Sequence, residues 1–217
     1  MSNQPGGRLN VGVIGAGPVG TVLGEALAGA GHQLVQGLPQ DVLAEADLVL
    51  FAIPAEEISN TVAGYAKAGL FKPGQLVAHT AGEFGIEVLQ PAVEQGVIPL
   101  AIHPAMTFTG TQVDHARIRE SYFGVAAPEV ALPIAQALVI EMGAEPIVIS
   151  DEDRKIYFEA ISVANNFSKL IVNQSIGLLE SIGIEHARVV LGPLIRSAVE
   201  EALADGHTPI NPEELLK

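Results

Sequence analysis

Short hydrophobic runs alternate, over roughly the first two thirds of the chain, with segments whose hydrophobic positions recur every three or four residues. The runs predict strands at residues 11–14, 33–36, 48–53, 75–79, 97–102, 122–126 and 146–149. The longer segments predict helices at residues 18–30, 55–68, 86–95 and 130–142, with little more than one helical turn at 42–46. A loop rich in Thr and Gly is expected after the strand at 97–102. Alternating strands and helices indicate an α/β fold with a doubly wound, mostly parallel sheet.

The pattern changes at Asp151, after which no strand is predicted. Residues 154–181 and 186–204 form two long helical patterns, the second interrupted at Gly192-Pro193. Two helices of this size cannot enclose a core, so their hydrophobic faces need a partner surface. We therefore predict two domains, residues 1–150 and a small all-helical domain of residues 151–217, with a second copy of the chain covering part of the helices in a homodimer. The hydrophobic faces comprise Ile161, Phe167, Leu170, Ile171, Leu178, Val189, Val190, Leu194, Ile195 and Val199.

A glycine-rich segment joins the first predicted strand to the first helix. Its residues, Gly15-Ala-Gly-Pro-Val-Gly20, fit the G-x-G-x-x-G pattern of dinucleotide-binding βαβ units. Gly15 allows a sharp turn, Gly17 lets the backbone approach a pyrophosphate, and Gly20 allows close helix packing. Pro18 suits the first helical turn, whose free N–H groups favour phosphate. We expect a pyrophosphate at Gly15, Ala16, Gly17, Pro18, Val19 and Gly20, the alternative being a turn that only permits close packing.

The end of the second predicted strand lacks the usual residue that reads the adenosine ribose. Dinucleotide sites place Asp or Glu there for NAD, or Arg nearby for NADP. This chain has Gln36-Gly37-Leu38-Pro39 and no charged residue before Asp41. The sequence therefore leaves open whether the cofactor is NADP or NAD, and whether catalysis is retained.

The amino-acid composition restricts the classes of molecule that this protein can bind. With 48% hydrophobic and 17% charged residues the chain can bury a sizeable core, and its net charge of −14 disfavours nucleic acid and anionic membranes as partners. The absence of cysteine excludes disulfides, thiolate catalysis and Cys-type metal sites, and no His, Asp or Glu spacing predicts a metal site. Neither a signal peptide nor a membrane-spanning run is predicted. We expect a cytoplasmic protein that acts on a small-molecule substrate.

Two histidines follow predicted parallel strands at the edge where ligands bind in open α/β sheets. His79 is the last residue of the strand at 75–79 and His103 directly follows the strand at 97–102, with Thr80 and Thr107 close by in sequence. A histidine there can donate a proton to a carbonyl, or orient it, during hydride transfer. Alternatively, each caps backbone groups in a loop, and His103-Pro104 only shapes that loop.

Several segments together resemble the 6-phosphogluconate dehydrogenase-like superfamily. They are residues 11–20, 46–54, 79–82, 103–110 and 164–167, of which the His-Pro-x-x-Thr-Phe segment at 103–108 is the more specific. Within it, the chain is similar to Rossmann-like oxidoreductases related to pyrroline-5-carboxylate reductase. The resemblance implies a nicotinamide cofactor across the strand ends and a helical, frequently dimerising, C-terminal domain. The chain departs from it in the short region after Gln36, in its short C-terminal segment, and in Tyr157-Phe158 where relatives have a Tyr-His pair.

The resemblance also implies roles for individual residues. Ile53, Pro54 and Thr80 are expected beside the nicotinamide ribose. Lys169 and Asn173 have the Lys-x-x-x-Asn spacing of hydroxyacid dehydrogenases, and Asn166 matches a Ser-Asn position. We expect His103, Lys169 and Asn166 to be the catalytic, substrate-facing residues. For Lys169, a solvated position on the helix surface is equally consistent with the sequence.

These expectations together predict an NAD(P)-dependent oxidoreductase. It would transfer a hydride between a nicotinamide cofactor and a small carbonyl, imine or hydroxy compound. The alternative is a catalytically inactive nucleotide-binding or dimeric scaffold protein that retains the Rossmann fold. The short region after Gln36 favours that alternative.

Overall fold

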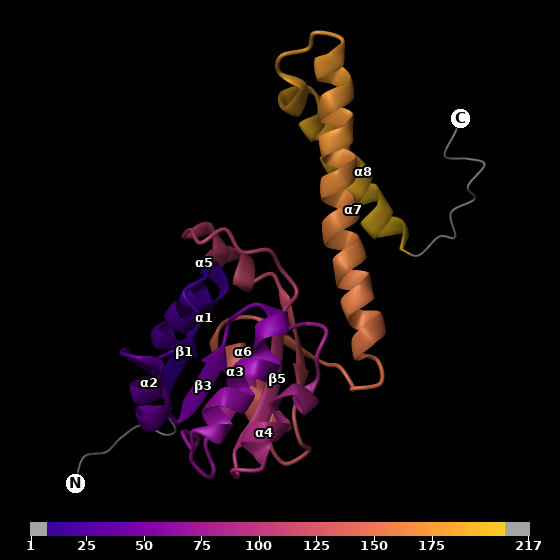
Figure 1. The fold of residues 1–217 in the computed structure, drawn as a ribbon. Coiled ribbons are helices and arrows are strands. Elements are labelled where there is room, and N and C mark those ends of the chain that lie inside the picture. The colour runs from indigo at the N-terminus through magenta and orange to yellow at the C-terminus, as the bar shows by residue number, and fades with distance from the viewer. Residues whose placement is uncertain (1–7, 207–217) are drawn as a thin grey trace. The chain divides into compact units, whose positions relative to one another are not determined.

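The computed structural model describes residues 8–206, and the chain divides into two compact units, Met1–Glu159 and Ala160–Lys217. The first unit contains a seven-stranded sheet in the order β2-β1-β3-β4-β5-β6-β7, with helices on its faces (Figure 1). The strands are β1 Asn10–Ile14, β2 Gln33–Val35, β3 Leu48–Phe51, β4 Leu76–His79, β5 Ile98–Pro104, β6 Tyr122–Ala126 and β7 Glu145–Val148.

The first five strands are parallel, whereas β6 is antiparallel to β5 and β7 is parallel to β6. The carboxyl ends of β1 to β5 therefore lie along one edge. Because β2 pairs on one side of β1 and β3 on the other, the direction in which successive strands are added to the sheet reverses between β1 and β3. Open α/β sheets bind ligands outside the strand ends at such a switch point.

The helices of the first unit cover both faces of the sheet. They are α1 Pro18–Gly29, α2 Pro39–Glu45, α3 Ala55–Lys67, the 3-10 helix Ile86–Leu89, α4 Gln90–Val93, α5 Val113–Ile118 and α6 Leu132–Glu141. Leu48 and Leu50 of β3 join a core cluster with side chains of α1 and α6. Val49 and Phe51 join a second cluster with side chains of α2 and α3. A strand buried on both faces confirms the predicted doubly wound architecture.

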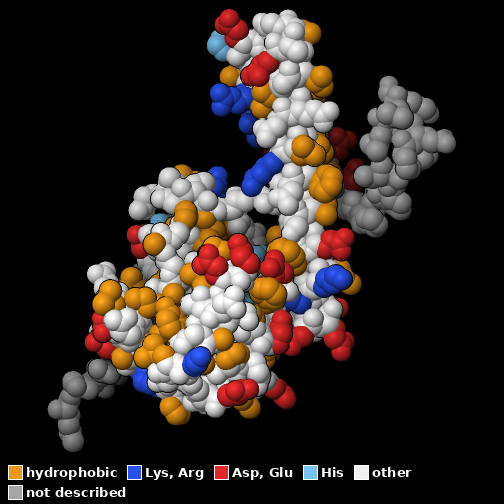
Figure 2. All heavy atoms as spheres, viewed as in Figure 1, with side chains coloured by type: hydrophobic (Ala, Val, Ile, Leu, Met, Phe, Trp, Pro, Cys, Tyr) orange, Lys and Arg blue, Asp and Glu red, His pale blue; other side chains and the backbone are white. Residues whose placement is uncertain are grey.

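The second unit is helical in its described part. Helix α7, Arg154–Ser181, begins at the end of the first unit, and α8, Ala187–Asp205, follows after a reversal of the chain (Figure 1). Packing of α7 and α8 leaves most of their hydrophobic side chains exposed, and these are the side chains that the sequence predicted to need a partner surface. Phe167, Leu178 and Leu194 are 57%, 64% and 65% exposed, and Figure 2 shows hydrophobic side chains along this unit. Within residues 8–206, no helix has the length and hydrophobicity needed to span a bilayer.

Three local predictions were wrong. Helix α5 lies where a loop was expected, because Asp114 fixes the turn that begins this short helix. Helix α2 has seven residues rather than about one turn, since Pro39 starts it before Val42. Helix α8 runs through Pro193 without interruption, because a proline removes one backbone hydrogen bond and need not end a helix whose neighbouring turns persist.

Two boundaries also differ from prediction. The helix expected at 86–95 is a 3-10 turn followed by a four-residue α-helix. Strand β5 continues through His103 and Pro104 instead of ending at Ile102, because both residues pair with β6. His103 is therefore held by a strand ladder rather than by a loop.

Candidate functional site

The glycine segment forms the turn between β1 and α1. Gly15 has φ +132°, and a Cβ there would lie 2.2 Å from the Ala52 carbonyl oxygen. A Cβ on Gly20 would lie 2.8 Å from the Gly15 carbonyl oxygen and 2.9 Å from Val13 Cγ1. Packing of β1, α1 and the end of β3 therefore accounts for both glycines.

Gly17 differs from Gly15 and Gly20 because nothing among the described residues requires glycine at this position. Its φ and ψ are −80° and 171°, which any residue adopts, and a Cβ there would have no atom of the described chain within 4 Å. Gly17 is also the N-cap of α1 and makes no side-chain cap. Pro18 has no N–H group, so the free N–H groups of the first turn begin at Val19, and they lie beside an open backbone, the arrangement that receives an anion.

A cavity of about 540 Å³ opens beside this turn. Its lining includes Gly15, Ala16, Gly20, Val35, Gln36 and Gly37. The cavity therefore runs from the glycine turn to the carboxyl end of β2, where the adenosine half of a dinucleotide binds in this fold. Glu25 is the one charged residue in the lining, so this wall offers no cation to a ribose 2′-phosphate.

The residues expected beside the nicotinamide follow β3 and β4. Ile53 approaches Gly15, where a Cβ would lie 3.3 Å from Ile53 Cγ2, and Pro54 is the N-cap of α3. The Thr80 backbone N–H donates to the Phe51 carbonyl at 3.1 Å. Gly15, Ile53, Pro54 and Thr80 therefore lie along one sheet edge, but their contact with a cofactor stays a prediction.

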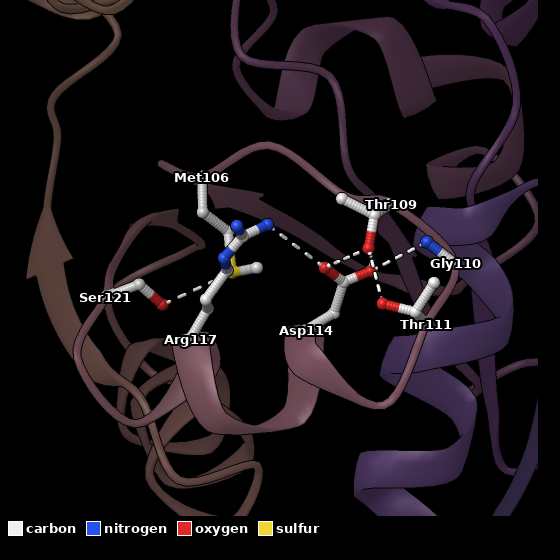
Figure 3. Close-up of polar contacts among 7 residues, drawn as sticks. All are labelled: Met106, Thr109, Gly110, Thr111, Asp114, Arg117 and Ser121. Carbon is white, nitrogen blue, oxygen red and sulfur yellow. Dashed lines mark hydrogen bonds and ion pairs between the residues drawn. The ribbon is translucent and has the colours of Figure 1, made fainter. Parts of the chain in front are cut away.

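The segment after β5 passes the start of α1. Asp114, which is fully buried, accepts hydrogen bonds from the Thr109 N–H at 2.7 Å, the Thr109 hydroxyl at 2.9 Å and the Gly110 N–H at 2.8 Å (Figure 3). Arg117 Nη1 lies 3.6 Å from the same carboxylate (Figure 3). A Cβ on Gly110 would lie 3.6 Å from Pro18. The carboxylate thus fixes a turn next to the glycine segment.

Asp114 is held in its ionised form. Burial raises its pKa, but hydrogen bonds from Thr109, Gly110 and Thr111 lower the pKa by more, so that the net shift is downward. A second contact connects α5 to α1, because His115 Nε2 lies 2.9 Å from Glu25 Oε2. Sequence reasoning missed Asp114, although an Asp after a Thr-Gly-Thr turn is a known signal for side-chain to backbone bonding.

His103 pairs with a residue distant in sequence. Its Nδ1 lies 2.8 Å from the Tyr157 hydroxyl, and the two rings meet edge to face with centroids 5.6 Å apart. Burial lowers the pKa of His103 to about 4, with contributions from the positive Arg154 and from His79. Burial raises the pKa of Tyr157, and Arg154 opposes this shift. At neutral pH the pair is therefore a neutral imidazole beside a neutral phenol.

Two glycines make room for this pair. A Cβ on Gly82 would lie 2.8 Å from His103 Nε2 and 2.9 Å from Phe158 Cδ2. A Cβ on Gly124 would lie 2.8 Å from the Tyr157 hydroxyl oxygen. Tyr157 was noticed in the sequence only as a departure from a family pattern. These glycines show that the backbone around it is shaped to admit its ring.

His79 is fully buried at the end of β4. Its Nε2 lies 2.7 Å from the Gly85 carbonyl oxygen, so Nε2 carries the proton and donates it. Burial lowers the pKa of His79 to about 4, the Gly85 bond raises it in part, and Arg154 lowers it further. Nε2 therefore acts as the alternative predicted, because it caps a backbone carbonyl in a loop. Nδ1 is buried without a hydrogen-bond partner among the described residues.

Arg154, at the first position of α7, is 2% exposed. Its Cζ lies 5.9 Å from the centre of the Tyr157 ring, and none of its three guanidinium nitrogens has a hydrogen-bond partner in the described part of the chain. Burial lowers its pKa, while Tyr157, Asp151 and Glu87 raise it. A cation in the first turn of a helix is unfavourable because the N-terminal end of the helix dipole is positive. The position of Arg154 was therefore a sequence signal that this residue does more than stabilise its helix, and sequence reasoning missed it.

The other two residues expected to face the substrate belong to the second unit. Asn166 and Lys169 are exposed on α7, and the Asn165 amide donates to Asn166 Oδ1 at 3.3 Å. Thr107, in the first unit, is also exposed. The catalytic roles of Asn166 and Lys169 stay predictions. Among the described residues, no group of three His, Asp or Glu side chains could hold a metal ion.

Two family models match this chain. One, described as a Rossmann-like domain, matches residues 36–104, and the other, described as a domain of unknown function (DUF2520), matches residues 121–210. No curated protein matches the chain. The first match includes His103 and ends at Pro104, and the two matches agree with the resemblance to Rossmann-like oxidoreductases.

Solved structures share the fold at low sequence identity. A candidate NADP oxidoreductase of Bacteroides fragilis has a TM-score of 0.73 at 22% identity, covering 89% of this chain and 80% of that chain. A pyrroline carboxylate reductase of Plasmodium falciparum with NADP bound has a TM-score of 0.63 at 13% identity, covering 97% and 84%. A semialdehyde dehydrogenase NAD-binding protein of Cupriavidus necator, in complex with calcium and NAD, has a TM-score of 0.64 at 14% identity, covering 95% of this chain and 87% of that chain. At these identities the likeness establishes the Rossmann-like fold.

Proposed function

We propose that this protein is an NAD(P)-dependent oxidoreductase that transfers a hydride between nicotinamide and a small carbonyl, imine or hydroxy compound. The observation that carries the proposal is Gly17. Neither its backbone angles nor its packing requires a glycine, yet it caps a helix N-terminus that faces open space. A pyrophosphate that approaches the backbone supplies the missing reason. The similarity to structures named for NADP or NAD supports the same cofactors.

The chain's own residues supply binding and proton chemistry. The first turn of α1 would hold the pyrophosphate, the cavity by Gln36 would receive the adenosine, and Ile53, Pro54 and Thr80 would flank the nicotinamide. The nicotinamide, when bound, would supply or take up the hydride. We assign proton exchange with the substrate to His103, hydrogen-bonded to Tyr157, because a neutral imidazole has a nitrogen lone pair that can accept a proton. Asn166 and Lys169 are proposed to orient the substrate.

Gly17→Asp gives a direct test of cofactor binding. Asp is a favoured N-cap and its charge suits a helix N-terminus, so the variant should unfold at the same temperature as the parent or higher. The same charge repels a pyrophosphate. We expect NAD, NADH, NADP or NADPH to raise the unfolding temperature of the parent and to leave Gly17→Asp unaffected. Gly17→Asn, a favoured cap without charge, separates repulsion from bulk. No shift with any of the four dinucleotides would refute the proposal.

A second function, dinucleotide binding without catalysis, is favoured by the absence of a ribose-reading acid or arginine after β2. The cavity lining there contains Gln36 and Gly37 instead. A thermal shift with a dinucleotide, but no turnover over a panel of carbonyl, imine and hydroxy compounds, would select it. We also propose that the exposed hydrophobic side chains of α7 and α8 form a homodimer interface, and that the protein acts in the cytoplasm.

A further inference from the structure

The charge of Arg154 has no close counter-ion in the described part of the chain. Its side chain is almost completely buried, and none of its guanidinium nitrogens has a hydrogen-bond partner there. A guanidinium stays charged in proteins, and a buried charge without a partner costs several kcal/mol. The fold therefore keeps an unfavourable group at this point, and such groups are retained where a ligand uses them.

The nearest acidic side chains do not neutralise this charge directly. Asp151 and Glu87 raise the pKa of Arg154, but both are exposed and neither lies within 4.0 Å of it as an ion pair. Both carboxylates instead approach Gly85, where a Cβ would lie 2.1 Å from Asp151 Oδ1 and 2.6 Å from Glu87 Oε2. Water screens exposed carboxylates, so they compensate only part of the buried charge.

The groups that surround Arg154 on its inner side are neutral at physiological pH. Arg154 lies beside the Tyr157 ring, whose hydroxyl bonds to His103, and its charge lowers the pKa of both His103 and His79. The cluster thus carries one positive charge. His79 Nδ1 is a fourth buried nitrogen without a partner among the described residues, beside the three of Arg154. His103 and Tyr157 are half-buried, so solvent reaches part of these two side chains, and a ligand of the buried guanidinium has to enter beside them.

We propose that Arg154, together with His79, His103 and Tyr157, forms a binding site for a small monocarboxylate. A planar carboxylate matches the guanidinium fork with two parallel hydrogen bonds, and its single charge balances the single positive charge of the cluster. A divalent anion such as sulfate would leave an excess negative charge in a buried site. In the proposed oxidoreductase, this carboxylate belongs to the substrate, and the rest of the molecule lies toward His103. Only this assignment to the substrate rests on the proposed function.

Thermal unfolding of the full chain tests the site. Sodium chloride is replaced stepwise by sodium acetate at constant ionic strength, without dinucleotide. We expect acetate to raise the unfolding temperature of the parent, and the protection to weaken about tenfold or more in Arg154→Lys, which keeps the charge but loses the fork. Arg119→Gln, at an exposed arginine, should keep full protection. Equal protection of the parent and Arg154→Lys, no protection beyond chloride, or equal protection by sulfate would overturn the inference.

Arg154→Met separates ligand binding from a structural role. Methionine fills much of the same volume without charge, so the variant should unfold in chloride at the same temperature as the parent or higher, and acetate should not protect it. A lower unfolding temperature together with undiminished acetate protection would show a structural arginine and overturn the inference. Dinucleotide binding is measured separately. If acetate protects but no dinucleotide does, the proposed function fails and the carboxylate site stands.

Discussion

The Tyr157 hydroxyl lies 2.8 Å from His103 Nδ1, across 54 residues of sequence. Removing this oxygen in Tyr157→Phe leaves a partly buried imidazole nitrogen without its partner. We expect the free energy of unfolding to fall by about 1–2 kcal/mol in urea titrations. Tyr122→Phe is the matched control, because Tyr122 is 59% exposed. Equal stability of the two variants would mean that the hydroxyl contributes nothing to folding.

The buried histidines should make folding sensitive to mild acid. The pKa of both His79 and His103 is lowered to about 4, whereas the unfolded chain binds these protons near the ordinary value of 6.5. Above pH 6.5 both histidines are neutral in the folded and the unfolded state, so the free energy of unfolding keeps its full value. As the pH falls from 6.5 to 4, the unfolded chain takes up protons that the folded protein excludes, and the free energy of unfolding decreases by up to about 3 kcal/mol for each residue. Carboxylates also titrate in this range. For that reason the test compares the parent with His103→Gln, whose unfolding free energy should depend less steeply on pH.

Asp114→Asn should loosen the turn beside α1. The Asn oxygen can still accept both N–H groups at the position of Oδ2, but the amide nitrogen then replaces Oδ1 and cannot accept from the Thr109 hydroxyl. The negative charge that strengthens these bonds and faces Arg117 is also lost. We expect a lower urea midpoint at neutral pH and weaker dinucleotide binding. Because the pKa of Asp114 is lowered on folding, its contribution is present above its unfolded value and is lost as the pH falls through the folded value. The difference in urea midpoint between the parent and Asp114→Asn should therefore become smaller in strong acid. Glu129→Gln, at an exposed acid, is the control.

Two glycine-to-alanine changes should act in opposite directions. In Gly20→Ala the new Cβ would lie 2.8 Å from the Gly15 carbonyl oxygen, and the resulting overpacking should cost roughly 1–3 kcal/mol. In Gly64→Ala, inside α3, the Cβ meets nothing within 4 Å, and stability should rise by about 0.5–1 kcal/mol. Thermal and urea unfolding measure both changes. A stabilised Gly20→Ala would contradict the close contact between α1 and β1.

Leu178→Glu should weaken the proposed dimer. Leu178 is 64% exposed on α7, so the substitution costs the isolated unit little but places a charge in a hydrophobic interface. We expect light scattering at micromolar concentration to show dimers for the parent and monomers for the variant. Val130→Glu changes a 90% exposed side chain next to α6 and should leave the mass unchanged. A monomeric parent would refute the dimer.

Local sequence patterns were sufficient for most elements, because each element is encoded by its own period and its own end signals. Strand β6, Tyr122–Ala126, and helix α7, Arg154–Ser181, were predicted to the residue. One error occurred where a distant segment fixes the local backbone, because the last two residues of β5 depend on pairing with β6. Helix α5 was missed for a local reason, because it depends on the buried carboxylate of Asp114, which bonds to a turn four and five residues before it.

The sequence by itself determined the glycine turn, the order of the seven strands and of most helices, and the placement of His79 at a strand end and of His103 near one. Only the tertiary structure decided that Gly15 and Gly20 serve packing while Gly17 does not, because that distinction depends on which atoms surround an absent Cβ. It also brought Tyr157 to His103 and buried Arg154 without a hydrogen-bond partner among residues 8–206. Such contacts join residues far apart in the chain, and burial, which sets their pKa values and their energies, is a property of the packed fold.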